Sequence, residues 1–477
     1  MPSVFPMQRL SVFLPSLLGS AAIALLLYSA VPLTQSDGDL FAHIAFGRDI
    51  LHHGCSAPVS PAWGSAVLLA WLHALGGLPA IVCVVAVMAG LAHALVTHLL
   101  LRSGVAPLTA LLGGVVSVAL ASSHWLARPH AATLLLLAIL MLLLRGRDAR
   151  TIRWLIPLFA IWANLHGGWT FGLMVLVSHT IGEVIAPRQQ HSHRQRSTIL
   201  IAVTGLACVA TLATPYGIAL QRTILHTLQD GALAATVTEY QPPALTSPVD
   251  VLFLLIALGA LPILIATRAA WSPSTTLIVL LSIVVSLRAS RNIALFAFTG
   301  WPLLVMQAAR RHPTPSVPSV GNLTITQTVW WPGGLVAAGV LLLGAQGGQL
   351  WQREMLAVPI DATRFPVAAV DALQQAPPPG HVLTTWAWSG YVPYAWRGHQ
   401  AWFDPLHFTP ERMQQLGTLL TLRAGWRGLL DRAAIGTVLM PRRSALALAL
   451  ADDHAWDCWY HDRTATICRR RSAPDHL

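Results

Sequence analysis

Apolar runs alternate with short polar stretches along the chain up to about residue 348. Most of these runs approach the length of about 20 residues that a helix needs to cross a bilayer, so we interpret them as membrane-spanning helices. The run 64–103 contains Gly76-Gly77-Leu78-Pro79, which predicts a break between a short interfacial or re-entrant helix at 64–76 and a span. About eleven spans are expected, at 10–33, 79–101, 106–122, 131–145, 152–164, 168–186, 198–214, 250–267, 273–288, 291–308 and 328–348.

The pattern changes after residue 349, where Pro, Trp and polar residues mix. Apolar residues at helical spacing predict a helix over 365–375, and Pro377-Pro378-Pro379-Gly380 ends it. Asp462-Arg463-Thr464 predicts the turn of a closing hairpin. The other elements expected here are strands at 381–386, 398–403 and 434–440, a helical region at 410–432, and the hairpin itself at 456–468.

Two domains follow from this change of pattern. Residues 1–348 are predicted to form an all-α polytopic membrane bundle, in which residues 34–63 are the first extracytoplasmic loop. Residues 349–477 are predicted to form a small α/β domain. An odd number of spans places this domain on the side of the membrane opposite to the N-terminus.

Composition supports membrane insertion and changes the meaning of the charge. Hydrophobic residues make up 55% of the chain and charged residues 10%, whereas soluble domains carry about 25% charged residues. The net charge of +11 comes from Arg alone, since the chain has no Lys. Up to residue 348 these arginines lie mostly in short loops between apolar runs, as the positive-inside rule predicts. We therefore expect the lipid bilayer as a partner and no nucleic acid.

The charge of the loops also predicts the topology. With the N-terminus in the cytoplasm, the cytoplasmic loops carry clusters such as Arg145, Arg147 and Arg150. The loops on the other side hold sparse polar residues of mixed chemistry. We expect a multi-pass protein of the bacterial inner membrane, with a cytoplasmic N-terminus and an extracytoplasmic C-terminal domain.

The polar residues of these extracytoplasmic loops are the candidate site. Each one alone is explained by ordinary snorkelling at the end of a span, but together they supply carboxylate, imidazole, guanidinium and amide groups at one depth. If the helices bundle, these groups can converge on one cavity. The candidates are Asp37, Asp39, His43, Arg128, His130, Asn164, His166, Tyr216, Glu239, Arg288, Arg291 and Asn292.

This set of groups suits glycosyl transfer from a lipid-linked sugar phosphate. Asp37 or Asp39 can act as general base for the acceptor hydroxyl. Arginines can hold the departing phosphate, and histidines can donate hydrogen bonds. The acceptor is a glycan, a lipid or a protein. The two carboxylates also have the spacing of a pair that shares a divalent metal such as Mg²⁺ or Mn²⁺.

Two other classes of function remain open. A transporter or flippase of a lipid-linked or small polar substrate also lines a cavity with polar groups. Such proteins often show inverted repeats and charges at mid-membrane depth; the chain shows no repeat, and its polar groups lie at one face. A non-catalytic scaffold for envelope assembly is the third interpretation.

The first loop and several later motifs resemble a group of bacterial multi-pass membrane proteins. The stretch Asp37-Gly38-Asp39-Leu40-Phe41-Ala42-His43-Ile44 is similar to the D-x-D-L-W-W-H-L pattern of that group, with Phe41-Ala42 in place of the paired tryptophans. Trp162-Ala163-Asn164-Leu165-His166-Gly167-Gly168 is similar to its W-A-N-x-H-G-G. The resemblance implies the architecture of the GT-C superfamily of polyprenyl-phosphate-sugar glycosyltransferases. It also implies that an acidic residue of the first loop, Asp37 or Asp39, is the catalytic base.

Cys458 and Cys468 lie symmetrically about the predicted hairpin turn. An oxidising compartment permits a disulfide between them, although cross-strand geometry does not always suit one. The pattern leaves open a disulfide or two buried thiols.

Overall fold

The computed structural model describes residues 38–55, 58–124, 126–146, 148–186, 191–229, 238–266, 271–311, 360–376 and 380–471. The spans expected at 10–33 and 328–348 lie outside these residues, and so does Asp37. The chain divides into two compact units. The first includes Val82–Leu225 and the described part of Ala234–Arg353; the second includes the described parts of Thr34–Ile81 and Glu354–Leu477. Each unit is described by itself.

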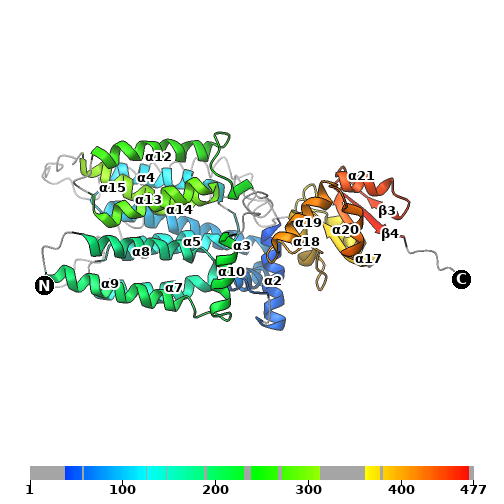
Figure 1. Ribbon diagram of the computed structural model, residues 1–477, viewed down its shortest axis with the longest axis horizontal. Coiled ribbons are helices and arrows are strands. Elements are labelled where there is room, and N and C mark those ends of the chain that lie inside the picture. Colours follow the sequence, from blue (N-terminus) through cyan, green and yellow to red (C-terminus); the bar gives the residue numbers. More distant parts are fainter. Residues whose placement is uncertain are drawn as a thin grey trace. The chain divides into compact units, whose positions relative to one another are not determined.

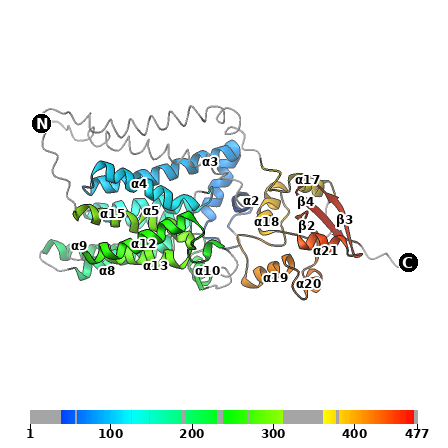
Figure 2. The same ribbon diagram turned by 90° about the horizontal axis from the view of Figure 1, so that it is seen from above.

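The first unit is a bundle of helices. Long apolar helices lie side by side in it: α13 packs against α8, α7 against α9, and α14 against α4 (Figures 1 and 2). Helices α3 and α10 each continue from one unit into the other. The helices are α3 (Trp63–Arg102), α4 (Pro107–Ala121), α5 (His130–Leu144), α6 (Ala149–Arg153), α7 (Leu155–Leu165), α8 (Trp169–Ile185), α9 (His191–Ala210), α10 (Ile218–Gln229), α12 (Pro248–Ala266), α13 (Pro273–Arg288), α14 (Ile293–Phe298) and α15 (Gly300–Arg311). Short 3₁₀ turns, η1 (Ser122–His124), η2 (Thr238–Tyr240) and η4 (Ser290–Asn292), link some of them.

Helices occupy the spans expected within the described residues, but their number as spans is not confirmed. Helix α10 was not expected, because it lies between the spans predicted at 198–214 and 250–267, and α9 begins seven residues before the first of these. The break expected in the longest apolar run is present, because Gly76 and Gly77 have non-helical backbone inside α3 and the φ of Gly77 is +64°. Among the described helices, three are long and apolar enough to cross a membrane, or up to four if the pair bent by 47° at Thr299 is one span. The other apolar helices are shorter than 18 residues.

Helix α12 shows why this unit needs an apolar solvent. Leu255, Leu258, Leu261 and Ile265 are all more than half exposed. They follow one another at spacings of three and four residues, so they form one apolar stripe. An exposed stripe of this kind is unfavourable in water and favourable against lipid chains.

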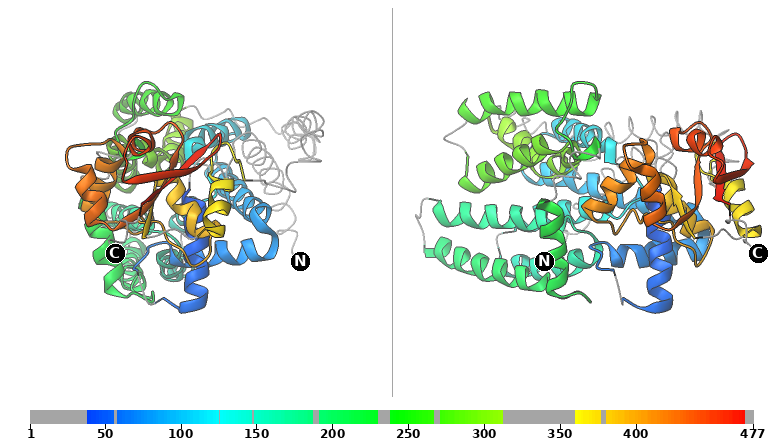
Figure 3. Two further views of the ribbon diagram at one scale, coloured as in Figure 1. Left: turned by 90° about the vertical axis from the view of Figure 1, so that its right-hand side faces the viewer. Right: turned by 45° about the vertical axis from the view of Figure 1, so that its right-hand side comes forward.

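The second unit contains a four-stranded sheet with the order β1-β2-β4-β3 (Figure 3). Strand β1 pairs in parallel with β2, and the other two pairings are antiparallel. Strand β2 is buried along nearly its whole length, as a central strand covered by helices must be. The strands are β1 (His381–Thr384), β2 (Ile435–Pro441), β3 (Trp456–His461) and β4 (Ala465–Arg470), and the helices are α2 (Asp39–His53), α17 (Val367–Gln375), α18 (Trp386–Ala395), α19 (Pro410–Leu420), α20 (Trp426–Arg432) and α21 (Ala445–Ala451).

Three local expectations differ from this structure. The strand expected at 398–403 is wrong: within it only Ala401 pairs, through a single bridge to Val382. The helical region at 410–432 is two helices, because Leu422 and Gly425 both have positive φ and end the helical path between them. The loop at 34–63 holds helix α2, whose buried residues recur at helical spacing, at Leu40, Ile44, Gly47 and Ile50 among others.

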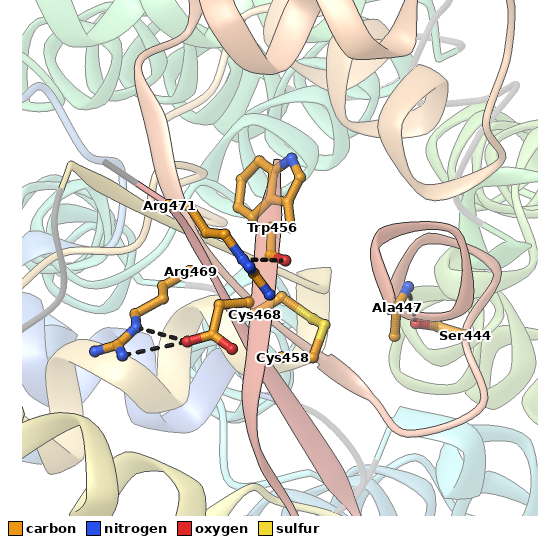
Figure 4. Close-up of a disulfide and its surroundings, with 8 residues drawn as sticks. Ser444, Ala447, Trp456, Cys458, Cys468, Arg469 and Arg471 are labelled. Atoms are coloured by element: carbon orange, nitrogen blue, oxygen red, sulfur yellow. Dashed lines mark hydrogen bonds and ion pairs between the residues drawn. A yellow bond between two sulfur atoms is a disulfide. The ribbon is translucent and has the colours of Figure 1, made fainter. Parts of the chain in front are cut away.

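The C-terminal hairpin forms as the sequence predicts, with its turn at 462–464. Cys458 and Cys468 are directly opposed in β3 and β4, and their sulfur atoms are bonded (Figure 4). The neighbouring pair is ionic: Arg469 Nη2 lies 3.2 Å from Asp457 Oδ2. Of the two alternatives that the sequence leaves open for the cysteines, the structure has the disulfide.

Candidate functional site

Helix α2, which begins at Asp39 within the first loop motif, lies in close contact with helix α18. A Cβ atom added at Gly38 would lie 1.7 Å from the carbonyl oxygen of Ala387, and one added at Gly390 would lie 2.3 Å from the carbonyl oxygen of Gly38. A Cβ at Gly47 would lie 2.0 Å from the carbonyl oxygen of Ala66 in α3. The glycines of the motif therefore let three backbones approach one another, and they fix the position of α2 within the second unit.

Arg48, which lies four residues after the motif on α2, has a packing role. Its Nη1 donates a hydrogen bond of 3.0 Å to the carbonyl oxygen of Tyr394, near the end of α18. Its Nη2 lies 3.2 Å from His73 Nδ1, and His73 Nε2 lies 2.9 Å from the Tyr394 hydroxyl. These contacts satisfy a helix carbonyl and tie α2, α3 and α18 together.

Asp39 and His43 lie on one face of α2, because they are four residues apart. Asp39 is the first residue of the helix, where the helix dipole favours a carboxylate. His43 is buried, and its Nδ1 has no hydrogen-bond partner among the described residues. Burial lowers the pKa of His43 to about 3; the nearby His407 also lowers it, and Asp404 opposes them. His43 is therefore neutral at pH 7.

An Asp–His pair faces this helix from the loop after β1 and α18. His407 Nδ1 lies 2.9 Å from Asp404 Oδ2, and the other carboxylate oxygen of Asp404 accepts from the Leu406 N–H at 2.9 Å. The His407 ring lies against Phe46 of α2, with 4.6 Å between centroids. This pair was not predicted from the sequence. The spacing Asp-x-x-His is the one local signal for the pair, and no local pattern indicates that the loop lies against α2.

The first unit brings together three candidates from distant parts of the sequence: Arg128, Glu239 and Arg291, which we name the arginine–glutamate cluster. Arg291 Nη1 lies 3.2 Å from Glu239 Oε1, and Arg128 Nη1 lies 3.9 Å from Glu239 Oε2. The guanidinium carbon of Arg291 also lies 4.3 Å from the centre of the Tyr240 ring. The side chains of Arg128, Glu239 and Arg291 are 17%, 33% and 25% exposed.

Backbone contacts hold this cluster in place. The Ser290 N–H donates to the carbonyl oxygen of Gln241 at 2.8 Å, and the Ser290 hydroxyl donates to the carbonyl oxygen of Glu239 at 3.3 Å. These two bonds join η2 to η4. Burial lowers the pKa of Arg128, Glu239 raises it, and Arg291 lowers it, so Glu239 reduces the repulsion between the two guanidinium groups.

The W-A-N-x-H-G-G motif forms a structural network. Trp162 Nε1 donates to the Thr133 hydroxyl oxygen at 3.0 Å, and that oxygen lies 2.8 Å from His166 Nδ1. Gly168 donates its N–H to the same nitrogen at 3.1 Å, and a Cβ there would lie 2.4 Å from the Thr133 hydroxyl oxygen. Asn164 donates to the carbonyl oxygens of residues 160 and 213 at 2.7 and 2.8 Å. The motif therefore joins α5, α7 and α8 tightly.

The remaining candidates make contacts of other kinds. His130 Nε2 pairs with the carbonyl oxygen of His124. Asn292 donates to the carbonyl oxygen of Val285 at 3.0 Å, which closes the end of α13. Arg288 is exposed and Tyr216 is half-buried. Because Asp39 and His43 belong to the second unit and the arginine–glutamate cluster to the first, the single cavity expected from the sequence stays a prediction.

No group of three or more His, Cys, Asp or Glu side chains within the described ranges is arranged to hold a metal ion. The metal site predicted from Asp37 and Asp39 has only its second carboxylate inside those ranges. It stays a prediction.

The fold matches solved membrane-protein structures. ArnT from Cupriavidus metallidurans, bound to undecaprenyl phosphate, matches with a TM-score of 0.53 at 15% identity, over 94% of this chain and 97% of that one. The oligosaccharyltransferase AglB from Archaeoglobus fulgidus, in complex with an inhibitory peptide and a dolichol-phosphate, matches with a TM-score of 0.55 at 10% identity, over 90% of this chain and 69% of that one. No family model and no curated protein sequence matches the chain.

At this low identity the likeness shows the fold alone. The likeness agrees with the mostly helical bundle and the additional small sheet that the structure shows.

Proposed function

We propose that the protein is a membrane glycosyltransferase that moves a sugar from a polyprenyl-phosphate donor to an extracytoplasmic glycan, lipid or protein acceptor. The observation that carries this proposal is the fold match along 94% of this chain to a structure that holds undecaprenyl phosphate. A second match, over 90% of the chain, is to an oligosaccharyltransferase in complex with dolichol-phosphate. Both lipids present a phosphate at the end of a polyprenyl chain.

Each cluster suits one requirement of this reaction. Asp39, at the start of α2, is the proposed general base that takes the proton of the acceptor hydroxyl. Asp37 is the alternative carboxylate. Arg128 and Arg291 are the proposed phosphate-binding groups, because guanidinium groups form paired hydrogen bonds with phosphate oxygens. A divalent metal held by the two aspartates is a variant of the same proposal.

The proposed location is the bacterial inner membrane, with the C-terminal α/β part outside the cytoplasm. The Cys458–Cys468 disulfide supports this side, since disulfides persist in oxidising compartments. Labelling of single cysteines introduced near residues 165 and 400 from outside the cell, and protection of those near 148 and 192, tests the topology. The opposite labelling pattern would contradict it.

The function is tested by mass spectrometry of lipid-linked sugars and envelope glycans in a strain that lacks the protein. We expect one lipid-linked sugar to accumulate and one glycan to lose a residue. The wild-type chain should restore both, and Asp39→Asn should not. Asp49→Asn is the matched control, because Asp49 lies on the same helix and its exposed side chain contacts only His53 in the described structure, at 2.9 Å. Unchanged glycans in the deletion strain would favour transport or scaffolding instead.

A further inference from the structure

The arginine–glutamate cluster places a carboxylate where the proposed function needs a phosphate. Each carboxylate oxygen of Glu239 faces a different guanidinium group, Oε1 that of Arg291 and Oε2 that of Arg128. Phosphate oxygens bridge two arginines in the same way. One-third of the Glu239 side chain is exposed, so an anion can approach the two arginines beside it.

The charge of the cluster is what distinguishes it from a bare pair of arginines. Two guanidinium groups and one carboxylate give two positive charges and one negative, a net charge of +1. Tyr240 stacks on Arg291 and adds no charge at neutral pH. His124 lies close enough to interact with Arg291 and Glu239. The cluster therefore balances an anion with one negative charge and not one with two.

The proposed reaction changes the charge of the phosphate by one unit. The donor is a phosphodiester, which carries one negative charge. Transfer breaks the bond between the anomeric carbon and a phosphate oxygen, and forms a bond from that carbon to the acceptor oxygen. The acceptor proton goes to the carboxylate base, and the phosphate keeps the oxygen. The spent carrier is then a phosphomonoester, which carries close to two negative charges above its second pKa of about 6.

We propose that Glu239 lowers the preference of this cluster for the phosphomonoester product over the phosphodiester donor, and that it thereby promotes release of the spent carrier. The inference rests on the proposed function. With Glu239 in place the charge of the donor is balanced, whereas the product leaves one uncompensated negative charge beside the carboxylate. Without the charge of Glu239 both esters would bind more tightly, and the doubly charged product would gain more than the donor.

The test measures binding of two short probes, farnesyl phosphate and its methyl diester, to the purified full chain in detergent at pH 7.5. Glu239→Gln removes one negative charge and keeps the size of the side chain. We expect the affinity to rise about tenfold for the diester and about a hundredfold for the monoester, because the interaction with the lost charge doubles when the ligand charge doubles. At pH 5 the monoester carries one charge, so the two gains should become equal.

Two variants control for changes in folding. Glu239→Asp keeps the charge and should keep the wild-type ratio of the two affinities. Glu183→Gln removes a carboxylate of the same unit that pairs with Arg196 at 3.8 Å, and it should leave both affinities unchanged. Thermal unfolding of each variant shows that the compared proteins are folded.

The outcomes separate this inference from the function on which it rests. Equal gains for the two probes at pH 7.5, or weaker binding of both to a folded Glu239→Gln protein, would overturn the selective role of Glu239 and leave the proposed function standing. If the wild-type chain and every variant bind neither probe, the phosphate-binding role of the cluster fails, and this inference fails with it.

Discussion

The ionisable groups of the arginine–glutamate cluster and those on the face of α2 that carries Asp39 and His43 lie in opposite environments. Arg128 and Arg291 both pair with Glu239, and all three side chains keep part of their surface exposed. His43 is buried, neutral at pH 7 and close to an Asp–His pair. A paired, partly hydrated cluster can exchange one anion for another at little cost. A buried face shifts the pKa values of its groups. The comparison teaches that the two candidate clusters differ in environment, and the proposed function assigns phosphate binding to the first and the base, Asp39, to the second.

The largest expected effect is on the rate of sugar transfer, and it tests the proposed role of Asp39 as the general base. Asp39→Asn keeps the size of the side chain and removes the base, so we expect the rate to fall by a factor of about 10² to 10⁴. The measurement is the initial rate at which the glycan identified in the deletion strain reappears after induction of each variant. Asp49→Asn should keep the wild-type rate. A normal rate for Asp39→Asn would move the role of base to Asp37 or remove it from this helix.

The next effect is on the free energy of unfolding. It tests whether the packing of α2 depends on the close contact between its backbone and that of α18. Gly38→Ala places a methyl group against the carbonyl oxygen of Ala387, so one of the two backbones must move. We expect a loss of about 3 kcal/mol in the free energy of unfolding, measured as a fall in the thermal midpoint in detergent. Gly417→Ala in α19 is the control, since nothing lies within 4 Å of its added methyl group. Equal midpoints for the two variants would show that the contact is not close.

A smaller effect is expected from the pH dependence of His43. Its pKa is about 3 in the folded chain and about 6.5 when unfolded. The unfolded state therefore binds the proton first, and folding stability is complete above pH 6.5 and falls as the pH is lowered towards 3. Between pH 7 and pH 5 the wild type should lose roughly 2 kcal/mol more than His43→Phe. Thermal midpoints at the two pH values measure this difference. A parallel loss in both proteins would show that His43 is hydrated in the native state.

The smallest effect concerns the stability of the arginine–glutamate cluster. Because its ion pairs are partly exposed, Arg291→Gln should cost less than about 1 kcal/mol of folding free energy. The same change should weaken binding of farnesyl phosphate strongly. Thermal unfolding and probe binding on one preparation measure the two effects. A large loss of stability with unchanged probe binding would show that the cluster supports the fold and does not bind phosphate.

The sequence predicted elements well where the periodicity of apolar residues decides the structure. Most of the described helices of the first unit, the helix at 367–375 and the C-terminal hairpin follow from local patterns, whereas α10 was not predicted. The helical region at 410–432 was predicted as continuous, because the positive φ of Leu422 is not visible in its residue type. The strand expected at 398–403 does not form, because only Ala401 pairs, through its bridge to Val382.

Some contacts among the candidate site residues follow from loop position, whereas others do not. Loop position brought Arg128, Glu239 and Arg291 to attention, and these three do meet. Loop position could not show that Asn164 and Asn292 satisfy backbone carbonyls. Contacts between α2 and distant segments, such as that between Phe46 and His407, depend on tertiary packing that no local pattern encodes.

The strand order β1-β2-β4-β3 has a consequence for biosynthesis. Strand β4 is the last of the four along the chain, yet it pairs with β2 on one side and β3 on the other. During synthesis, one edge of β2 and one edge of β3 stay unpaired until β4 has formed. The disulfide also forms only then, because Cys468 lies in β4. A chain truncated before residue 465 would therefore leave the edges of β2 and β3 that face β4 unpaired and open to chaperones and proteases, whereas a released chain that includes residue 471 can pair both.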